Sequence, residues 1–149
     1  VLFRSGLMLV APLSACSGDS HLVNIALNEH QLAPCPSSPN CVSSHASAES
    51  QRVDALRYDV DRAQAQVHLL RVLNEMARVK ITRAEATYVH AEFRSALFGF
   101  VDDVEFHFDA PGSIQVRSAS RVGYSDFGVN RARVDLIRDR FAALAGQAL

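Results

Sequence analysis

The chain has 149 residues, of which 48% are hydrophobic and 21% are charged, and its formal net charge is -1. This length and composition are those of one globular domain and exclude a disordered or collagen-like chain. A net charge this close to zero supplies no broad basic field, so it points neither to a nucleic-acid partner nor to an anionic membrane.

The first sixteen residues contain, in order, the features of a secretory signal. Arg4 precedes an apolar run over 7–13, which is too short to span a bilayer. The sequence Leu-Ser-Ala-Cys at 13–16 resembles the lipobox, where bacterial lipoproteins are cleaved and acylated on the cysteine. We therefore expect residues 1–16 to be a lipoprotein-type signal, with lipidation at Cys16 and a membrane as partner through that anchor. The alternatives are a plain secretory signal and a short buried helix with a chance cysteine.

Residues 17–33 begin polar and lack sustained periodicity, which is typical of a tether between an anchor and a domain. In some bacteria an Asp directly after the lipidated cysteine retains a lipoprotein in the inner membrane. Here Ser17 occupies that place and Asp19 comes too late. We expect an exported protein anchored on the periplasmic side, with the outer membrane favoured over the inner, and a single α+β domain over 34–149.

Two further cysteines, Cys35 and Cys41, enclose the turn-rich stretch 36–40. In an exported protein such a pair is expected to form a disulfide. Metal binding together with His45 or His30 is a weaker alternative, because zinc motifs space their cysteines more closely. Redox chemistry is also weaker, since thiol-exchange motifs usually have two intervening residues.

The first regular element is predicted to be an amphipathic helix over 59–78. Asp59 or Asp61 is placed to cap its start, and Arg78 suits its last turn. Apolar residues recur at steps of three and four and define the face expected to pack inward: Val60, Ala63, Val67, Leu70, Leu73 and Ala77.

Alternating polar and apolar residues then predict four strands, over 79–84, 87–94, 101–108 and 114–121. The turn at 109–112 separates the last two. In the second and third strands, the residues expected inward are Val89, Ala91, Phe93, Val104, Phe106 and Phe108.

A second helix follows, with Asn130 as its predicted cap. Successive strands joined by short turns imply an antiparallel sheet. We predict an α+β fold in which about four strands carry two main helices on one face, in the order helix, four strands, helix. The apolar stripe expected for the second helix is Val134, Ile137, Phe141 and Leu144.

The outward residues of three strands are unusually charged. Hairpin pairing places Glu105 opposite or next to Arg117, and His90 and Glu92 near Glu105 and Asp103. This face suits a recognition surface or a catalytic cleft, in which close carboxylates shift a pKa upward or bind a hard cation and His90 acts as general base. The alternative is a solvated face with weak ion pairs. The candidate face consists of His90, Glu92, Arg94, Asp103, Glu105, Arg117 and Arg121.

The loop and helix start within 117–133 form a second candidate site. Arginines there surround glycines and turn-forming residues and lead into a helix N-terminus, which favours anions. The candidate anion loop consists of Ser125, Asp126, Asn130 and Arg131. The alternative is a turn that is pinned by salt bridges from its arginines to Asp102, Asp103 and Glu105.

Signals for cofactor chemistry are absent from the sequence. No phosphate-binding or dinucleotide fingerprint occurs, so we expect no cofactor and name no metal ligands. A catalytic triad of Ser118 or Ser120 with His90 and an Asp has little support, because nothing around these serines resembles a nucleophile elbow.

Four segments carry a family resemblance: 35–46, 88–95, 98–106 and 116–133. Together and in this order they resemble the domain-of-unknown-function family numbered 1499, over most of the chain from about Pro34 to the final helix. The resemblance implies small exported, lipoprotein or membrane-linked proteins. It implies no known activity, so no catalytic residue is carried over.

These observations favour a lipid-anchored bacterial envelope protein whose domain is a non-enzymatic binding module. The charged face and the arginine-rich loop would take an anionic or zwitterionic small molecule. One alternative is an envelope hydrolase, metal-dependent or not, that uses the carboxylates and His90. Another is a protein-interaction or assembly module that docks a partner through the charged face.

Overall fold

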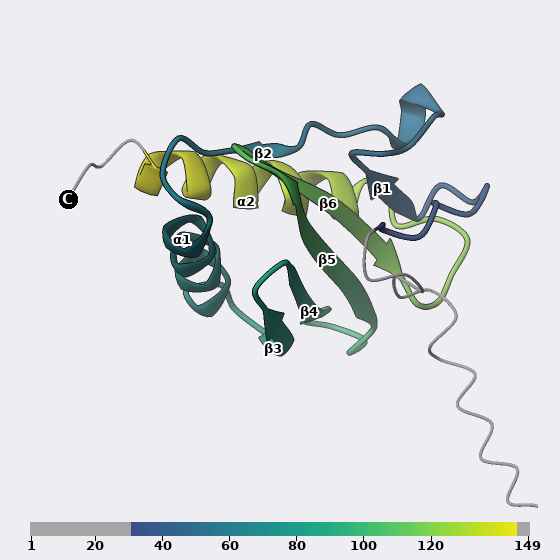
Figure 1. Ribbon diagram of the computed structural model, residues 1–149. Coiled ribbons are helices and arrows are strands. Elements are labelled where there is room, and N and C mark those ends of the chain that lie inside the picture. The colour runs from purple at the N-terminus through teal and green to yellow at the C-terminus, as the bar shows by residue number, and fades with distance from the viewer. Residues whose placement is uncertain (1–30, 146–149) are drawn as a thin grey trace, which may run out of the picture.

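The computed structural model describes residues 31–145 (Figure 1). The elements, in chain order, are β1 Cys41–Ser43, the short 3-10 helix η2 Glu49–Gln51, β2 Leu56–Arg57, α1 Arg62–Asn74, β3 Val79–Glu85, β4 Tyr88–Arg94, β5 Val101–Ala110, β6 Ser113–Ser120 and α2 Val129–Ala145.

The strands form one antiparallel sheet in the order β1-β6-β5-β4-β3, and β2 also pairs with β6. The four predicted strands are confirmed as β3 to β6. The predicted count of four is too low and the helix-first order is wrong, because β1 and β2 precede α1. These two strands have three and two residues, too few for alternation to reveal them.

Both helices pack on the same face of the sheet, as predicted (Figure 1). The residues expected inward on β4 and β5 are all buried in the core beneath them. Burying one such side chain contributes about 1.5–3 kcal/mol. The opposite face of the sheet carries the charged residues.

The apolar face of α1 differs from the predicted one. The helix is capped by Asp61, whose carboxylate accepts a hydrogen bond of 2.9 Å from the Gln64 amide. Val67 is 59% exposed, and of the predicted stripe only Leu73 is fully buried. Two stripes of the same spacing exist in this segment, and contacts with α2 and β3 decide which of them packs inward. The buried stripe is Ala65, Leu69, Val72 and Leu73.

The start of α2 is also capped differently. Asp126, not Asn130, caps it, since its carboxylate accepts hydrogen bonds from the amides of Gly128 (3.0 Å) and Asn130 (2.8 Å). Gly128 has φ +83°, a conformation that favours glycine. The predicted stripe is otherwise confirmed: Val134, Ile137 and Phe141 are buried.

Asn130 instead lies in the first turn of α2 and is fully buried. Its amide group donates to the backbone oxygen of Asn40 (3.1 Å) and to the hydroxyl of Ser120 (3.0 Å). Its oxygen accepts hydrogen bonds from Arg133 (2.6 Å) and Ser118 (2.5 Å). One side chain therefore joins α2 to β6 and to the residue that precedes β1.

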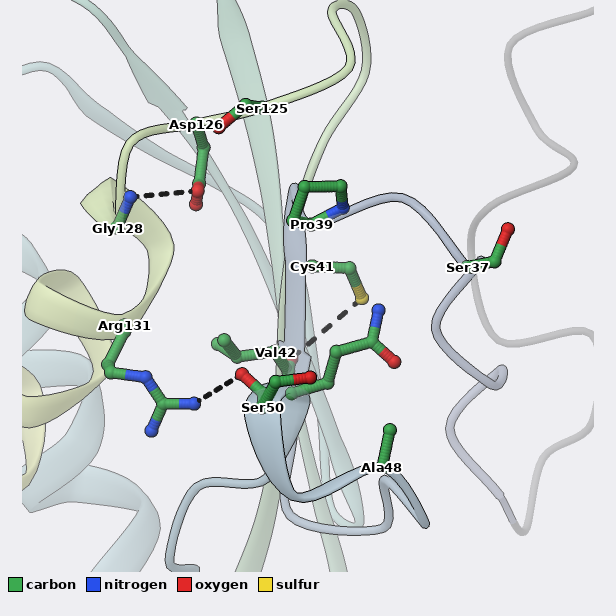
Figure 2. Close-up of a pocket in the computed structure, with 11 residues that line it drawn as sticks. Ser37, Pro39, Cys41, Val42, Ala48, Ser50, Ser125, Asp126, Gly128 and Arg131 are labelled. Atoms are coloured by element: carbon green, nitrogen blue, oxygen red, sulfur yellow. Dashed lines mark hydrogen bonds between the residues drawn. The ribbon is translucent and has the colours of Figure 1, made fainter.

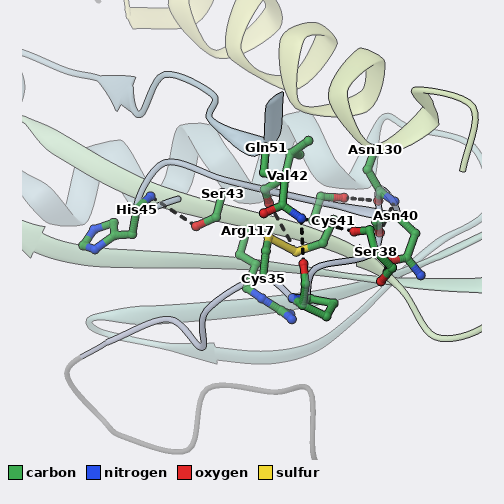
Figure 3. Close-up of a disulfide and its surroundings, with 12 residues drawn as sticks. Cys35, Ser38, Asn40, Cys41, Val42, Ser43, His45, Gln51, Arg117 and Asn130 are labelled. Carbon is green, nitrogen blue, oxygen red and sulfur yellow. Dashed lines mark hydrogen bonds between the residues drawn. A yellow bond between two sulfur atoms is a disulfide. The ribbon is translucent and has the colours of Figure 1, made fainter. Parts of the chain in front are cut away.

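The predicted disulfide is present between Cys35 and Cys41, with a Cα–Cα distance of 5.6 Å (Figure 3). Cys41 is paired with Ala119 of β6, so the bridge fixes the chain entering the domain to this edge of the sheet. The cysteines are accordingly not available as free thiols for metal binding or thiol exchange.

The predicted signal at 1–16, the lipidation site Cys16 and most of the predicted tether at 17–33 lie outside the described residues. Of the last three tether residues, Leu32 is buried. Within 31–145, neither helix combines the length and apolar character that crossing a membrane requires.

Asn130→Leu should destabilise the domain by about 2 kcal/mol or more, because it leaves several buried polar groups without their partner. Urea unfolding measures this loss. Asn74→Ala, at an exposed asparagine of α1, is the matched control and should change stability little. Equal effects of the two substitutions would show that the Asn130 contacts do not hold the layers together.

Candidate functional site

The charged face of the sheet is buried rather than solvated. His90, Asp103, Glu105 and Arg117 are each no more than 3% exposed. The strand register is as predicted: Glu105 lies opposite Arg117 and His90. We call His90, Glu92, Asp103, Glu105, Arg117 and Arg121 the charged cluster. The interpretation of this face as a wet surface with weak pairs is therefore wrong for the four buried residues, whereas Arg94 is exposed and pairs loosely with Glu92.

Asp103 is the centre of the charged cluster. Arg121 donates to both of its oxygens at 2.8 Å, and His90 Nε2 lies 2.8 Å from Oδ1. Burial by itself would raise the pKa of Asp103, but the hydrogen bonds from Arg121 and His90 outweigh it and lower that pKa to about 2. The expected upward shift is wrong for this carboxylate.

The guanidinium of Arg121 also joins two acids. Besides Asp103 it binds Glu92, at 2.7 Å. These hydrogen bonds raise the pKa of Arg121 above its ordinary value despite partial burial. A guanidinium therefore occupies the place between carboxylates where the sequence suggested a hard cation. Among residues 31–145, no three His, Cys, Asp or Glu side chains are grouped so that they could hold a metal ion.

Glu105 forms the second half of the charged cluster. It accepts hydrogen bonds from the Tyr88 hydroxyl (2.7 Å) and from Arg117 Nη1 (3.1 Å). Burial, and then the adjacent Glu105 carboxylate, raises the pKa of Tyr88. The guanidinium of Arg83 lies 4.9 Å from the centre of the Tyr88 ring, which adds a cation–π contact.

His90 connects the charged cluster to an exposed hydroxyl. A register irregularity lies between Ile81 and Arg83, and the intervening Thr82 contacts His90 Nδ1 through its hydroxyl. An ionised Asp103 only accepts hydrogen bonds, so His90 Nε2 carries the proton between them. Thr82, His90 and Asp103 thus form a continuous hydrogen-bonded chain. Sequence reasoning missed Thr82 because the irregularity in β3 is invisible in the residue pattern.

The triad built from Ser118 or Ser120 with His90 is excluded by geometry. Both serines contact Asn130 of α2, on the helix-covered side of the sheet. His90 belongs to the charged cluster on the opposite face.

The candidate anion loop is held by contacts within the protein. Arg131 donates to the backbone oxygens of Arg52 (2.9 Å) and Ser50 (2.8 Å), and Asp126 caps α2. The Ser125 hydroxyl accepts from the amide of Phe127.

Three other arginines pair with the acids that the alternative interpretation named: Arg117 with Glu105, Arg121 with Asp103 and Arg133 with Asp102. The pinned-turn interpretation is confirmed for these three pairs.

Ser125, Asp126 and Arg131 nevertheless line a cavity of about 430 Å³ between the cysteine loop, η2 and the start of α2 (Figure 2). The Arg131 guanidinium points at Ser50 in this view, and the Asp126 carboxylate at Gly128. The charged groups of this cavity are thus already bonded within the protein.

A larger groove of about 690 Å³ lies between the end of α1, the end of β4 and the α2 residues from Val129 to Arg140. It was not predicted, because only the packed fold brings these three segments together. Its lining includes apolar side chains, among them Phe93, Ala132 and Leu136. Four arginines line it against only two acids, Glu75 and Asp102, and we call it the arginine groove: Arg78, Arg94, Arg133 and Arg140.

The four arginines differ in the ion pairs and hydrogen bonds that their guanidinium groups make within the protein. Arg133 pairs with Asp102 at 2.6 Å and stacks over Phe93 at 4.8 Å. The Arg94 side chain is 55% exposed. Its guanidinium Nη2 lies 3.7 Å from Oε2 of Glu92, which makes a loose ion pair. Arg140 is exposed and makes no ion pair or hydrogen bond with any other residue in 31–145. Arg94, predicted on the charged face, pairs there with Glu92 and also lines the groove.

Fold and site together define a small α+β domain with a buried, internally paired charged cluster and an open cationic groove beside it. The chain belongs to the family described as "Protein of unknown function (DUF1499)", whose model matches residues 31–141. This match covers nearly all of the residues that the structure describes. A search of curated proteins found no match.

Acid titration should reveal the role of Asp103. Its folded-state pKa of about 2 lies below the ordinary 3.8, so its ionised form stabilises the fold above about pH 4. This contribution, roughly 2 kcal/mol, is lost as the pH falls from about 4 towards 2. Urea unfolding of the parent and Asp103→Asn should therefore show a stability difference that shrinks over this range.

Asp139→Asn, at an exposed carboxylate of α2, is the control for that titration. Its difference from the parent should stay small at every pH. A difference between the parent and Asp103→Asn that does not change between about pH 4 and 2 would contradict the assigned ion pairing.

Proposed function

We propose that this protein is a non-enzymatic binding module of the bacterial envelope that takes an anionic ligand in the arginine groove. The observation that carries the proposal is the contrast between two sets of arginines. Arg117, Arg121 and Arg131 are bonded within the protein, whereas Arg94 and Arg140 project into an open groove with their donors largely unused. Guanidinium groups with donors left unused within the protein are the ones available to bind a carboxylate or phosphate.

The residues that line the groove restrict the class of ligand that it would bind. Apolar side chains lie between the arginines, and Arg133 is already neutralised by Asp102. A site of this composition favours an anionic group attached to an apolar portion over a free inorganic ion, since the apolar portion covers Ala132 and Leu136. The ligand class we propose is therefore an anionic amphiphile.

We propose further that the module acts on the periplasmic side of a membrane, the outer membrane favoured, with Cys16 as its lipid anchor. The lipobox-like residues 13–16 support this. The disulfide between Cys35 and Cys41 agrees with it, because such bonds persist in oxidising compartments.

An envelope hydrolase is the second candidate, and the chain from Thr82 through His90 to Asp103 is what favours it. In this function Thr82 would be the nucleophile and His90 the base. Hydrolysis of a panel of nitrophenyl esters tests it. Activity that Thr82→Ala abolishes, and that Thr87→Ala retains, would support the hydrolase. Absence of activity, or activity unaffected by Thr82→Ala, would reject it.

Titration calorimetry with decyl phosphate, kept below its micelle concentration, tests the binding proposal. Arg94→Ala combined with Arg140→Ala should weaken binding by about tenfold or more, because each removes a charge-assisted hydrogen bond. Arg57→Ala, at an exposed arginine of β2, is the matched control and should bind like the parent. Identical affinities for all three proteins, or no binding by any, would remove the arginine groove as the ligand site.

A further inference from the structure

Large apolar side chains are exposed on two loops at one end of the sheet. Between β4 and β5, Leu97 is 81% and Phe98 70% exposed, with Phe100 stacked on Phe98 at 5.5 Å. Between β6 and α2, Phe127 is 95% and Tyr124 77% exposed. We call these five side chains the aromatic end. Exposed large apolar side chains gathered on one part of a small domain mark an interaction surface.

The two loops are neighbours in space. Both begin at the same end of the central strands, where Asp102 is paired with Ser120. The Arg121 amide donates to the oxygen of Val101, which joins the bases of the two loops by a 3.1 Å hydrogen bond. In Figure 1, the β4–β5 connection and the loop after β6 lie at the same end of the sheet.

Hydrogen bonds within the β6–α2 loop fix the turn that holds Phe127 outward. Phe127 adopts a left-handed backbone conformation (φ 53°), which is unfavourable for a residue with a side chain. The Ser125 hydroxyl fixes this turn by accepting from the Phe127 amide, and Asp126 by accepting from that of Gly128. The turn therefore holds the Phe127 ring in solvent, where it gains almost no stabilisation from burial.

The arginine groove reaches the bases of both loops. Ser95 and Ala96, at the base of one loop, line it together with Val129 at the base of the other. The bases of both aromatic loops thus border the groove, and Arg94, the last residue of β4, lies next to the β4–β5 loop. Aromatic rings favour the level of lipid headgroups, and arginines next to them bind lipid phosphates.

We propose that the aromatic end docks on a bilayer that contains anionic phospholipid, with its rings among the headgroups and the groove arginines on lipid phosphate. This rests on the proposed function in taking the groove's ligand to be an anionic amphiphile. Charge complementarity between Arg94, Arg140 and an anionic surface favours a membrane over a protein partner of unspecified charge.

The path of the chain agrees with this orientation. The disulfide fixes Cys35 to Cys41, which is paired with Ala119, close to where β6 ends and the aromatic loop begins. The described chain therefore enters the domain near the aromatic end, on the side from which the β6–α2 loop starts.

The chain contains no tryptophan, so a single introduced tryptophan reports on one position. The test uses the full chain with Cys16→Ser, which removes the acylation site, and adds Phe98→Trp or Phe127→Trp. Val67→Trp, at an exposed position of α1, is the control. Fluorescence is measured with vesicles of phosphatidylcholine alone or mixed with phosphatidylglycerol, each with and without brominated acyl chains.

We expect the emission of Trp introduced at 98 and 127 to shift to the blue and to be quenched at least twofold by brominated lipid, only when phosphatidylglycerol is present. The reporter at 67 should stay unchanged. Equal behaviour of all three reporters, or no shift at 98 and 127, would overturn the docking proposal. Capture of a protein by the aromatic end in place of lipid would overturn it as well.

Adding Arg94→Ala and Arg140→Ala to the Phe127→Trp protein separates the two proposals. Loss of the blue shift supports docking through the groove. If decyl phosphate binds in the groove but the rings stay in water, docking fails and the proposed function stands. If the rings insert regardless of these arginines and decyl phosphate does not bind, the groove fails as the ligand site and insertion rests on the aromatic residues alone.

Discussion

A buried carboxylate in the middle of a sheet face constrains the rest of this domain. Asp103 is 1% exposed and still ionised, since Arg121 and His90 donate to it. Breaking one partner of such a pair leaves an uncompensated buried charge, which is far more costly than the net gain from forming the pair. Arg121 is the first residue after β6, so the loop that leads to α2 must start where its guanidinium reaches Asp103. The direction of this loop, and with it the aromatic end and one wall of the groove, depends on that contact.

The charges of the domain therefore divide into two groups with different roles. Those of the charged cluster stabilise one arrangement of strands and loops, and on the other face Asn130 and the pair Arg133–Asp102 hold α2 to the sheet. In the arginine groove, Arg94 and Arg140 remain open to solvent beside apolar surface. Arg94 is at the boundary between the groups, because it follows the charged face along β4 but projects into the groove.

Much of the fold was predictable, because alternation in four consecutive segments determines strands, facing and hairpin register, including Glu105 opposite Arg117. The burial of the charged face was not predictable, because the same alternation of polar and apolar residues occurs in strands with a solvated face and in strands with a buried one. Spacing alone did not determine which stripe of α1 packs inward, and Val67 was assigned wrongly. The groove was beyond sequence reasoning because α1, β4 and α2 meet only in the packed structure. Phe127 and Tyr124 stand in the sequence, but the sequence does not show that they are exposed.

The central claim is that the charged cluster serves stability and that ligand binds in the arginine groove. Backbone amide chemical shifts recorded during titration with decyl phosphate test it most directly. The account predicts that the amides of Arg94, Ala96 and Ala132 move, while those of the charged cluster stay in place. Shifts that are confined to the charged cluster, or to the loop around Ser125, with none in the groove, would contradict it.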